Sequence, residues 1–456
     1  MIGRREAYAI AAGILWGFGA PGTWAPVSAF AGWAALARSL EGRPVADGLR
    51  YLASGAITAA LATRWLGPDL VDAGVEHGRW LAAAWVAAAS ILRGLLGSVV
   101  GKAVRRGHAA PLAFGLAEAA WASLAPWVLW LPLDPTLTLG LSPSWLGPAA
   151  LAGPAGVALT WALAASAPRR HAVWLTGVGL ASAWIPWPSS GVPLRVAALQ
   201  PAIDPSVSDN AETRRALSAA VAALGVQATA DVLITPESAW HDPSTPWPDP
   251  RPSLVGTPGP GRQSATLWVN GQTVQRVDKY HATPGTERTV LGFGHDRLLA
   301  ATGPKAVDVA GTRAGVLICG EDLAPGGLAH VLHDNPTWIA ILSNDGWGQR
   351  SGGAIWHHAA AGRLAASSGR PVVRAALTGP SAIFDARGVA LAQRAAGETG
   401  WVQASITTRA PAWCGAQTSP WLGLAAAAIL FTPSRRRSPA PRSPCEPHPC
   451  PKREAG

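Results

Sequence analysis

The stretch 315–322 reads GVLICGED: a short apolar run stops at Cys319, and a carboxylate, Glu321, follows two residues later. A short apolar run of this kind is typical of a buried strand. A cysteine that ends such a strand can lie at a sheet edge, where backbone N–H groups and a nearby cation stabilise its thiolate. An apolar strand with a single cysteine nevertheless belongs more often to a core than to an active site. The interpretation of Cys319 therefore depends on the rest of the chain.

Two further stretches place a charged group at the end of a predicted strand or turn. DVLITPESAW at 231–240 carries Glu237, and QRVDKYHATPGTE at 275–287 carries Lys279 and then Glu287. Acyl transfer through a thioester needs a carboxylate that takes the thiol proton, and an ammonium that stabilises the thiolate and the tetrahedral oxyanion. Each charge alone fits a solvated surface group better. Carboxylate, ammonium and thiol together, each at the end of an element, are much less expected by chance.

Composition indicates a membrane part beside a globular domain. The 456 residues are 49% hydrophobic and only 14% charged, with 23 Trp, which is too apolar for an ordinary soluble chain. The net charge of +10 lies in short loops and in the tail, not in a patch interleaved with aromatic residues, so we do not expect nucleic-acid binding. The cysteines are too few and too scattered for a disulfide framework: Cys319, Cys414, Cys445 and Cys450.

Lysine is rare among the basic residues, which are overwhelmingly arginine. A lysine that is present despite this bias is therefore a slightly stronger indication of a specific role than usual. The lysines are Lys102, Lys279, Lys305 and Lys452.

The first 190 residues are a series of apolar runs broken by Pro, Gly and Arg. A helix needs about 20 predominantly apolar residues to cross a bilayer. Basic residues gather in alternate connections and at the amino terminus, which the positive-inside rule places in the cytoplasm. Seven crossings would then put the chain after Trp187 on the outer side. The predicted spans are 7–22, 25–38, 51–66, 80–99, 110–132, 146–166 and 172–187. Glu118, inside one span, faces either a polar cavity or a neighbouring helix, or packs structurally.

After Trp187 the pattern changes to short alternating runs that predict a strand-rich α/β domain. An apolar segment at 420–431 followed by RRR at 435–437 predicts a return crossing. The Pro/Ser/Arg-rich tail is predicted to be disordered, and its Cys-Glu-Pro-His-Pro-Cys stretch lacks a second ligand pair for a metal. The predicted parts are a helical membrane domain at 1–190, an α/β domain at 191–412, a terminal span at 413–433 and a basic cytoplasmic tail at 434–456.

Within the α/β domain, each predicted element is a short run with its own period. The predicted helices are 211–224 and 356–368, and the predicted strands are 195–200, 231–235, 265–269, 273–277, 314–318, 339–342, 372–376, 381–385 and 402–406.

These motifs resemble those of the nitrilase superfamily, whose members carry a Glu-Lys-Cys triad on an αββα sandwich. Within it the chain is most similar to the membrane-bound apolipoprotein N-acyltransferase family. The likeness lies in TPES at 235–238, DKYHATPGTE at 278–287, ICGED at 318–322, SNDGWGQ at 343–349 and the stretch 362–388.

The resemblance implies a role for each matching residue. It makes Cys319 the nucleophile, Glu237 the general base and Lys279 the oxyanion partner. Glu287 and Glu321 match supporting glutamates of the family. The likeness also implies pocket positions at Gly320, Asn344 and Trp347, and no metal or organic cofactor.

The chain departs from the family pattern at several positions. Gly320 stands where the family has Tyr, Leu377 stands where it has Asn, and PAID at 201–204 follows the first strand where QGN is usual. These departures concern the fine positioning of the site and the choice of substrate, and they leave the three triad groups in place.

The resemblance implies transfer of an acyl chain from a membrane phospholipid, through a thioester on Cys319, to the amino-terminal amine of a diacylglyceryl-cysteine apolipoprotein. It also implies a monomeric, multi-pass protein of the bacterial inner membrane with a periplasmic catalytic domain. One alternative is a membrane-tethered amidase or nitrilase-type hydrolase with the same triad and water as acceptor. Another is a non-enzymatic membrane homologue in which the departures mark lost activity.

Overall fold

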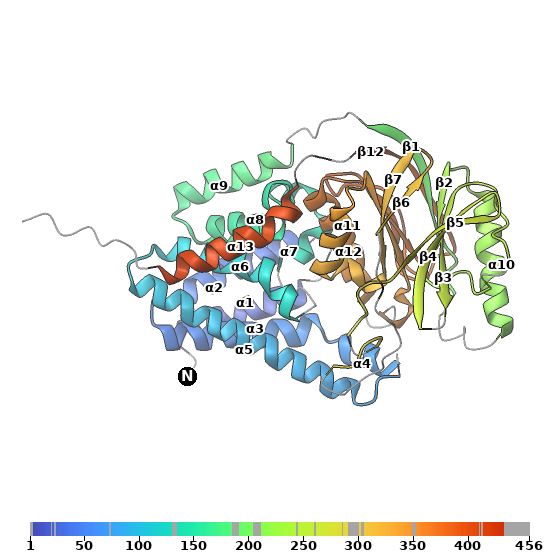
Figure 1. Ribbon diagram of the computed structural model, residues 1–456. Helices are drawn as coiled ribbons and strands as arrows, with labels where there is room; N and C mark the ends of the chain where they lie inside the picture. The colour runs from blue at the N-terminus through green and yellow to red at the C-terminus, as the bar shows by residue number, and fades with distance from the viewer. Residues whose placement is uncertain are drawn as a thin grey trace, which may run out of the picture.

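The computed structural model has a helical half and a strand-rich half (Figure 1). The predicted tail at 434–456 lies outside the residues that it describes, as do the side chains of Pro325 and Trp347. The described residues are 3–19, 21, 24–72, 74–129, 135–184, 191–203, 211–242, 245–259, 261–284, 286–290, 301, 305–348, 353–409, 411 and 414–432.

The helical half is built from the amino-terminal helices together with one helix from the end of the chain. The last helix, α13, packs against α6 and α8, although it begins only at Gly415 and those helices end at Leu129 and Ser166 (Figure 1). The bounds are α1 Arg4–Phe18, α2 Ala25–Ser39, α3 Pro44–Ala62, α4 Leu66–Asp72, α5 Gly78–Arg105, α6 Ala110–Leu129, α7 Pro135–Thr138, η1 Leu139–Leu141, η2 Pro143–Trp145, α8 Ala149–Ser166, α9 Arg169–Ser182 and α13 Gly415–Phe431.

Three helices within the described residues, α5, α6 and α8, are long and apolar enough to cross a membrane by length and composition. The other predicted spans also coincide largely with helices. The number of helices that cross the membrane stays a prediction. The start of α3 differs from the expected span, which began at residue 51. Arg50, which the predicted spans 25–38 and 51–66 leave in a connection, lies inside α3 and pairs with Glu6 and Glu41 at 2.8 Å each. Paired charges therefore extend this helix beyond its apolar run.

Close helix contacts in this half depend on small residues. A Cβ built on Gly97 of α5 would lie 2.5 Å from the Cβ of Tyr51 on α3, closer than side-chain atoms can approach. Small residues let helix backbones approach closely where lipid-like surroundings supply little hydrophobic drive for association. The α3–α5 contact is accordingly the most extensive helix pair among the described elements.

An ion pair is buried inside the helical half. Arg93 of α5 donates to both carboxylate oxygens of Glu118 on α6, at 2.9 and 3.1 Å, and Trp33 Nε1 donates to the same carboxylate at 3.2 Å. Both charged side chains are nearly inaccessible to solvent. Of the alternatives considered for Glu118, the structure therefore shows contact with neighbouring helices.

The described strands form two six-stranded sheets that pack face to face. The first has the order β12-β1-β2-β3-β4-β5 and the second β11-β10-β9-β8-β7-β6. The strands are β1 Val192–Gln200, β2 Val232–Ile234, β3 Ser253–Gly259, β4 Arg262–Val269, β5 Gln272–Asp278, β6 Ala306–Val309, β7 Thr312–Ile318, β8 Trp338–Ser343, β9 Val372–Ala376, β10 Ser381–Phe384, β11 Ala390–Arg394 and β12 Gly400–Thr408.

The core between the sheets follows from strand alternation. Val196 and Ala198 of β1 face the second sheet, whereas Ala197 and Leu199 face the helix α10 (Ala211–Gln227). The helices α11 (Pro325–His333) and α12 (Gly353–Ser368) cover the other face of the second sheet and lie towards the helical half (Figure 1). These layers make the αββα sandwich that was predicted.

Every strand predicted for the α/β domain is present within a few residues of its expected bounds. The strands β3, β6 and β11 and the helix α11 were not predicted. SLVGTPG in β3 contains Gly and Pro, which read as turn residues, and β11 is largely exposed and lacks a clear alternation. Pairing to neighbouring strands, not local preference, makes these segments strands.

The buried pair of Arg93 and Glu118 gives a test of the helical half. In Glu118→Leu the guanidinium stays buried without its carboxylate, and loss of one partner of such a pair costs about 3–5 kcal/mol. We expect a clear drop in the thermal unfolding midpoint in detergent, and recovery of most of the loss in the double variant Arg93→Leu/Glu118→Leu. Equal midpoints for the wild type and Glu118→Leu would contradict a stabilising role for the pair.

Candidate active site

Cys319 stands at the sharp turn between β7 and the short helix η4 (Cys319–Asp322). Its φ of +52° lies in the left-handed region, which non-glycine residues seldom adopt and which clusters at functional sites. The turn leaves the side chain half-buried instead of within the strand core. Sγ lies 4.0 Å from the carbonyl oxygen of Asn344. The predicted pocket position Asn344 is thus brought beside the predicted nucleophile.

Strand register explains why these groups meet. The parallel strands β7, β8 and β9 pair Ile318 with Leu342, and Ser343 with Ala376. Cys319 follows β7 and Asn344 follows β8, so both emerge at one edge of the second sheet. Groups at the carboxyl ends of neighbouring parallel strands meet at a common edge, where sites of α/β proteins usually form.

Glu237 reaches the same region from the first sheet. It follows β2, after Pro236, and its loop lies directly against β3. A Cβ on Gly256 of β3 would lie 2.0 Å from the Pro236 carbonyl oxygen, so only glycine allows this close approach. Ser238, the next residue, adopts a φ of +56°. The side chain of Glu237 is buried as a result.

Lys279 lies between two carboxylates. Its Nζ donates to Glu287 Oε1 at 2.8 Å and to Glu237 Oε1 at 3.4 Å, and its side chain is 1% exposed. Glu287 is held in turn by the backbone N–H of Thr283 at 2.7 Å. The structure therefore brings together the predicted base, the predicted oxyanion partner and the predicted supporting acid.

Burial and charge determine the protonation of this cluster. Burial raises the pKa of Glu237, and Lys279 opposes that rise. Burial acts to lower the pKa of Lys279, but the carboxylates of Glu237 and Glu287 outweigh it and hold that pKa well above its usual value. Burial and then Glu237 raise the pKa of the Cys319 thiol well above its ordinary range, against the effect of Lys279. The resting thiol is therefore protonated near neutral pH and needs a base, and a carboxyl with a raised pKa is a better base.

Glu321 is fully buried and accepts hydrogen bonds from both sides of the site. Oε1 accepts the backbone N–H groups of Tyr280 at 2.7 Å and His281 at 2.9 Å, and Oε2 accepts that of Ile318 at 2.8 Å. Oε2 also accepts Lys305 Nζ at 2.9 Å. Burial alone would raise the pKa of Glu321, but Lys305 and the backbone donors outweigh it and lower that pKa. The carboxylate therefore stays ionised.

Lys305 was not predicted as a site residue. It immediately precedes β6 and its side chain is 1% exposed; within the described residues its ammonium group donates to one main-chain carbonyl oxygen and one carboxylate oxygen. The scarcity of lysine in the sequence was the available indication. Its partners lie 16 and 27 positions away, so local pattern could not reveal the contact.

Two further buried pairs surround the nucleophile. His357 Nδ1 lies 2.9 Å from Asp322 Oδ1, so this histidine has a carboxylate partner. Arg374 of β9 forms an ion pair with Asp345. Both pairs brace the turns that follow β7 and β8.

The departures from the family pattern have different surroundings. Gly320 is buried within η4, where its carbonyl oxygen accepts the N–H of Leu323 at 3.2 Å. Leu377 is almost fully buried in an apolar cluster with Trp240 and Trp268. A leucine in place of an amide therefore extends the core at this position. The side chain of Trp347, the remaining pocket prediction, lies outside the described residues.

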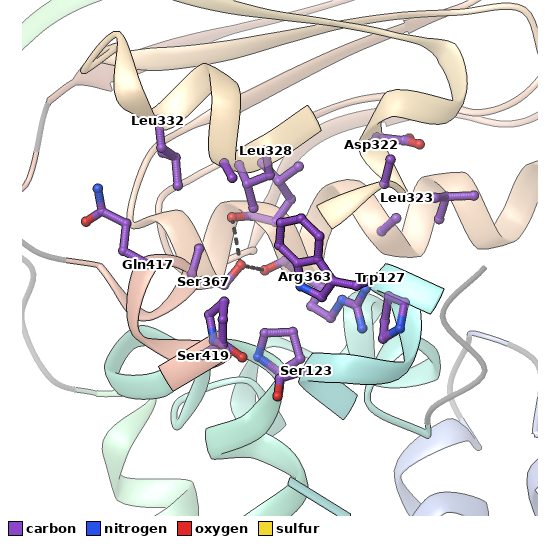
Figure 2. Close-up of a pocket in the computed structure, with 18 of the residues that line it drawn as sticks. Ser123, Trp127, Asp322, Leu323, Leu328, Leu332, Arg363, Ser367, Gln417 and Ser419 are labelled. Atoms are coloured by element: carbon purple, nitrogen blue, oxygen red, sulfur yellow. Dashed lines mark hydrogen bonds between the residues drawn. The ribbon is translucent and has the colours of Figure 1, made fainter. Parts of the chain in front are cut away.

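A cavity of about 360 Å³ lies beside η4, between the two halves of the molecule. In Figure 2, Leu328 and Leu332 of α11 lie on one side, and Ser123 of α6 and Ser419 of α13 lie on the other. Asp322 and Leu323, three and four residues after Cys319, form part of its wall. The lining is mostly apolar and includes the ends of candidate membrane helices. The segment that follows Cys319 thus borders a mostly apolar space that is also lined by the candidate membrane helices α6 and α8.

Residues 253–413 match the family model of the carbon-nitrogen hydrolases. The apolipoprotein N-acyltransferase of Bradyrhizobium diazoefficiens is 32% identical over 182 residues, which are 37% of this chain and 34% of the relative. That of Bordetella bronchiseptica is 31% identical over 193 residues, 38% and 35% of the two chains. That of Vibrio cholerae is 35% identical over 115 residues, 23% of each chain. The matches therefore span about a third or less of these relatives.

Among solved structures, Saccharomyces cerevisiae Nit3, a member of branch 10 of the nitrilase superfamily, aligns with 54% of this chain and 97% of its own. The TM-score is 0.36 and the identity 14%. The carbon-nitrogen hydrolase from Helicobacter pylori G27 aligns with 53% of this chain and 95% of its own, with a TM-score of 0.36 and 12% identity. The two sheets of the structure and the match to the carbon-nitrogen hydrolase family model confirm the predicted fold class: a helical region with three candidate membrane spans among the described residues, and a nitrilase-like α/β sandwich.

The charges around Cys319 predict how its reactivity depends on pH. Lys279 lowers the thiol pKa, so Lys279→Met raises it further, whereas Glu237→Gln lowers it. A neighbouring charge shifts a pKa by about one unit or more, so below the thiol pKa we expect iodoacetamide to label Lys279→Met about tenfold more slowly. Glu237→Gln should label faster. Peptide mass spectrometry over a pH series measures both, with a substitution at the exposed Arg195 of β1, Arg195→Met, as control. Superimposable profiles for all variants would contradict the charge assignment.

Proposed function

Because residues 253–413 carry a carbon-nitrogen hydrolase domain, we propose that this chain transfers an acyl group from a membrane phospholipid to the amino-terminal amine of a diacylglyceryl apolipoprotein. The observation that carries the proposal is that the buried ammonium of Lys279 contacts the carboxylates of Glu237 and Glu287, beside the turn that holds Cys319. The partial relatives named apolipoprotein N-acyltransferase and the candidate membrane helices support a lipid substrate.

In the first step, Cys319 Sγ attacks the ester carbonyl of the phospholipid while Glu237 takes the thiol proton. The carbonyl oxygen gains negative charge in the tetrahedral intermediate, and the Lys279 ammonium stabilises it. The bond from carbon to the glycerol oxygen then breaks, and Glu237 returns the proton to that oxygen. A lysophospholipid leaves, and the acyl chain remains on Cys319 as a thioester.

In the second step, the α-amine of the diacylglyceryl-cysteine attacks the thioester carbonyl. Glu237 takes a proton from the attacking nitrogen, and the carbon–sulfur bond breaks. The proton passes to the leaving sulfur, so the free thiol is restored and an amide is formed. One carboxylate thus acts as base and acid in both halves of the reaction.

The supporting residues have separate parts in this proposal. Glu287 orients Lys279 through its 2.8 Å contact, and Glu321 holds the turn on which Cys319 stands. Asn344, whose carbonyl oxygen lies beside Sγ, and Gly320, the residue after Cys319, remain proposed positions near the acyl carbonyl. The proposal needs no metal or organic cofactor.

We also propose that the phospholipid acyl chains enter from the membrane part through the cavity next to η4. Its volume, its apolar lining and its position between α6, α13 and α11 support a hydrocarbon occupant. This arrangement corresponds to a multi-pass protein of the inner membrane, with residues 1–190 and 413–433 in the bilayer and 191–412 as a periplasmic catalytic domain.

The acceptor distinguishes the transferase from a hydrolase. Purified protein in liposomes, given phospholipid and a diacylglyceryl lipopeptide, should form N-acylated lipopeptide and lysophospholipid in equal amounts. Since general acid–base groups contribute about 10²–10⁴ in rate, Glu237→Gln should slow the reaction by a factor in this range. Arg195→Met should behave as the wild type. Free fatty acid in place of acylated lipopeptide, measured by mass spectrometry, would instead identify a membrane-tethered hydrolase.

Filling the cavity should act on long acyl chains. Ala329 is exposed on α11 and lines the cavity, so Ala329→Trp reduces its volume without disturbing the core. We expect transfer from a long-chain phospholipid to slow about tenfold, which corresponds to about 1.4 kcal/mol, whereas a short-chain donor is used as before. Ala219→Trp on α10 is the matched control. An equal effect on both donors would place the chains elsewhere.

A further inference from the structure

We infer that Lys305 is a positioning residue which, through Glu321, fixes the turn that carries Cys319 relative to the segment that carries Lys279. The inference rests on the proposed function only in treating the site as catalytic. The contacts of Lys305 do not depend on which substrate the site takes. The hydrogen bonds of Lys305 within the described residues go to Asp334, Asp278 and Glu321, and not to the side chains of the proposed triad. Its action is therefore exerted through its partners.

The ammonium of Lys305 joins two segments of the site. Nζ donates to the carbonyl oxygen of Asp278 at 3.0 Å and to Glu321 Oε2 at 2.9 Å. Asp278 immediately precedes Lys279 in the chain, and Glu321 is two residues after Cys319. The backbone N–H of Lys305 is itself held by Asp334 Oδ2 at 2.6 Å. One buried cation thus lies between the two reactive segments.

Glu321 completes the connection. Its Oε1 accepts the N–H groups of Tyr280 and His281, the two residues after Lys279. Its Oε2 accepts the N–H of Ile318, the residue before Cys319. Together, Lys305 and Glu321 therefore bond the backbone on both sides of Lys279 and on the near side of Cys319.

This connection crosses between the two sheets. Lys279 follows β5, the edge strand of the first sheet, whereas Cys319 follows β7 in the second sheet. Ladder hydrogen bonds set distances within a sheet, and apolar packing, which is non-directional, holds one sheet on the other. Catalytic groups need to be held within about 0.5 Å of their productive geometry. The directional contacts of Lys305 and Glu321 supply this constraint where the two sheets meet.

Charge explains why a cation is needed and not only a space-filling side chain. Glu321 has no solvent exposure, and three backbone N–H groups leave its charge without a counter-ion. A buried carboxylate that loses its cation becomes protonated or draws in water. A protonated oxygen would donate instead of accept and would release the N–H of Ile318. Removal of Lys305 therefore loosens the turn of Cys319 although no reacting atom is touched.

The test compares Lys305→Met with Lys305→Arg and with Arg370→Met. Arg370 is as buried as Lys305, but it precedes β9 and so lies at the amino ends of the parallel strands, whereas the site lies at their carboxyl ends. Arg370→Met therefore controls for the loss of any buried cation. A misplacement of about 1 Å costs about 10²-fold in rate. We expect kcat for acyl transfer to fall about 10²-fold in Lys305→Met with the phospholipid KM nearly unchanged, and Lys305→Arg to recover a large part. Arg370→Met should keep kcat.

A double variant shows whether Lys305 acts through Glu321. Lys305→Met/Glu321→Gln should be no slower than the slower of the two single variants, because both remove the same connection. Iodoacetamide labelling of Cys319 gives a readout without substrate, and its pH profile should change in Lys305→Met but not in Arg370→Met. If Lys305→Met fails to fold, Lys305→Gln takes its place.

The outcomes separate this inference from the proposed function. Wild-type protein without acyl transfer overturns the proposed function, and the labelling profile still tests Lys305. A wild-type kcat and labelling profile in Lys305→Met, additive losses in the double variant, or equal losses in Arg370→Met would each overturn the inference.

Discussion

The whole site depends on one buried carboxylate. Glu321 is inaccessible to solvent and is satisfied by three backbone N–H groups and one ammonium. A buried charge is tolerated only when it is paired and hydrogen-bonded, so each of these donors has to be in place. Ile318 lies three residues before Glu321, whereas Lys305 lies 16 positions and Tyr280 41 positions before it, so these donors meet only in the folded sandwich. The left-handed turn at Cys319 is held at its base by this same carboxylate.

The thiol of Cys319 is part of a cluster of charged groups and is not isolated. Burial and Glu237 raise the pKa of Cys319, while Lys279 opposes them. The sulfur therefore rests as a thiol, and in the proposed mechanism Glu237 takes its proton. Asp322 and Leu323, which follow this turn, line a cavity that α6 and α13 also line. In the proposed function, this cavity connects the thioester site with the candidate membrane helices.

The sequence predicted the elements that carry strong local patterns. Apolar runs of strand length bounded by turn residues revealed β1, β7, β8 and β9, and the motifs around Glu237, Lys279 and Cys319 predicted groups that the fold does bring together. The fold class could also be predicted, because strands and helices alternate with clear periods. The catalytic roles of these residues stay proposals.

What the sequence did not reveal depends on distant partners. Lys305 reads as a surface lysine until the fold buries it against Glu321, and Arg50 reads as a loop residue until Glu6 and Glu41 pair with it. The strand β3 contains Gly and Pro and becomes a strand by pairing with β2 and β4. Long-range pairing outweighs local preference in each case.

The central claim is that Cys319 is an acyl-carrying nucleophile, and the most direct measurement is the intact mass of the protein after mixing with phospholipid alone. The account predicts a mass increase of one acyl chain, located on Cys319 and released by hydroxylamine as a thioester is. It also predicts that the adduct persists until an amine acceptor is added. An unmodified Cys319, or an acyl chain on another residue, would contradict the account.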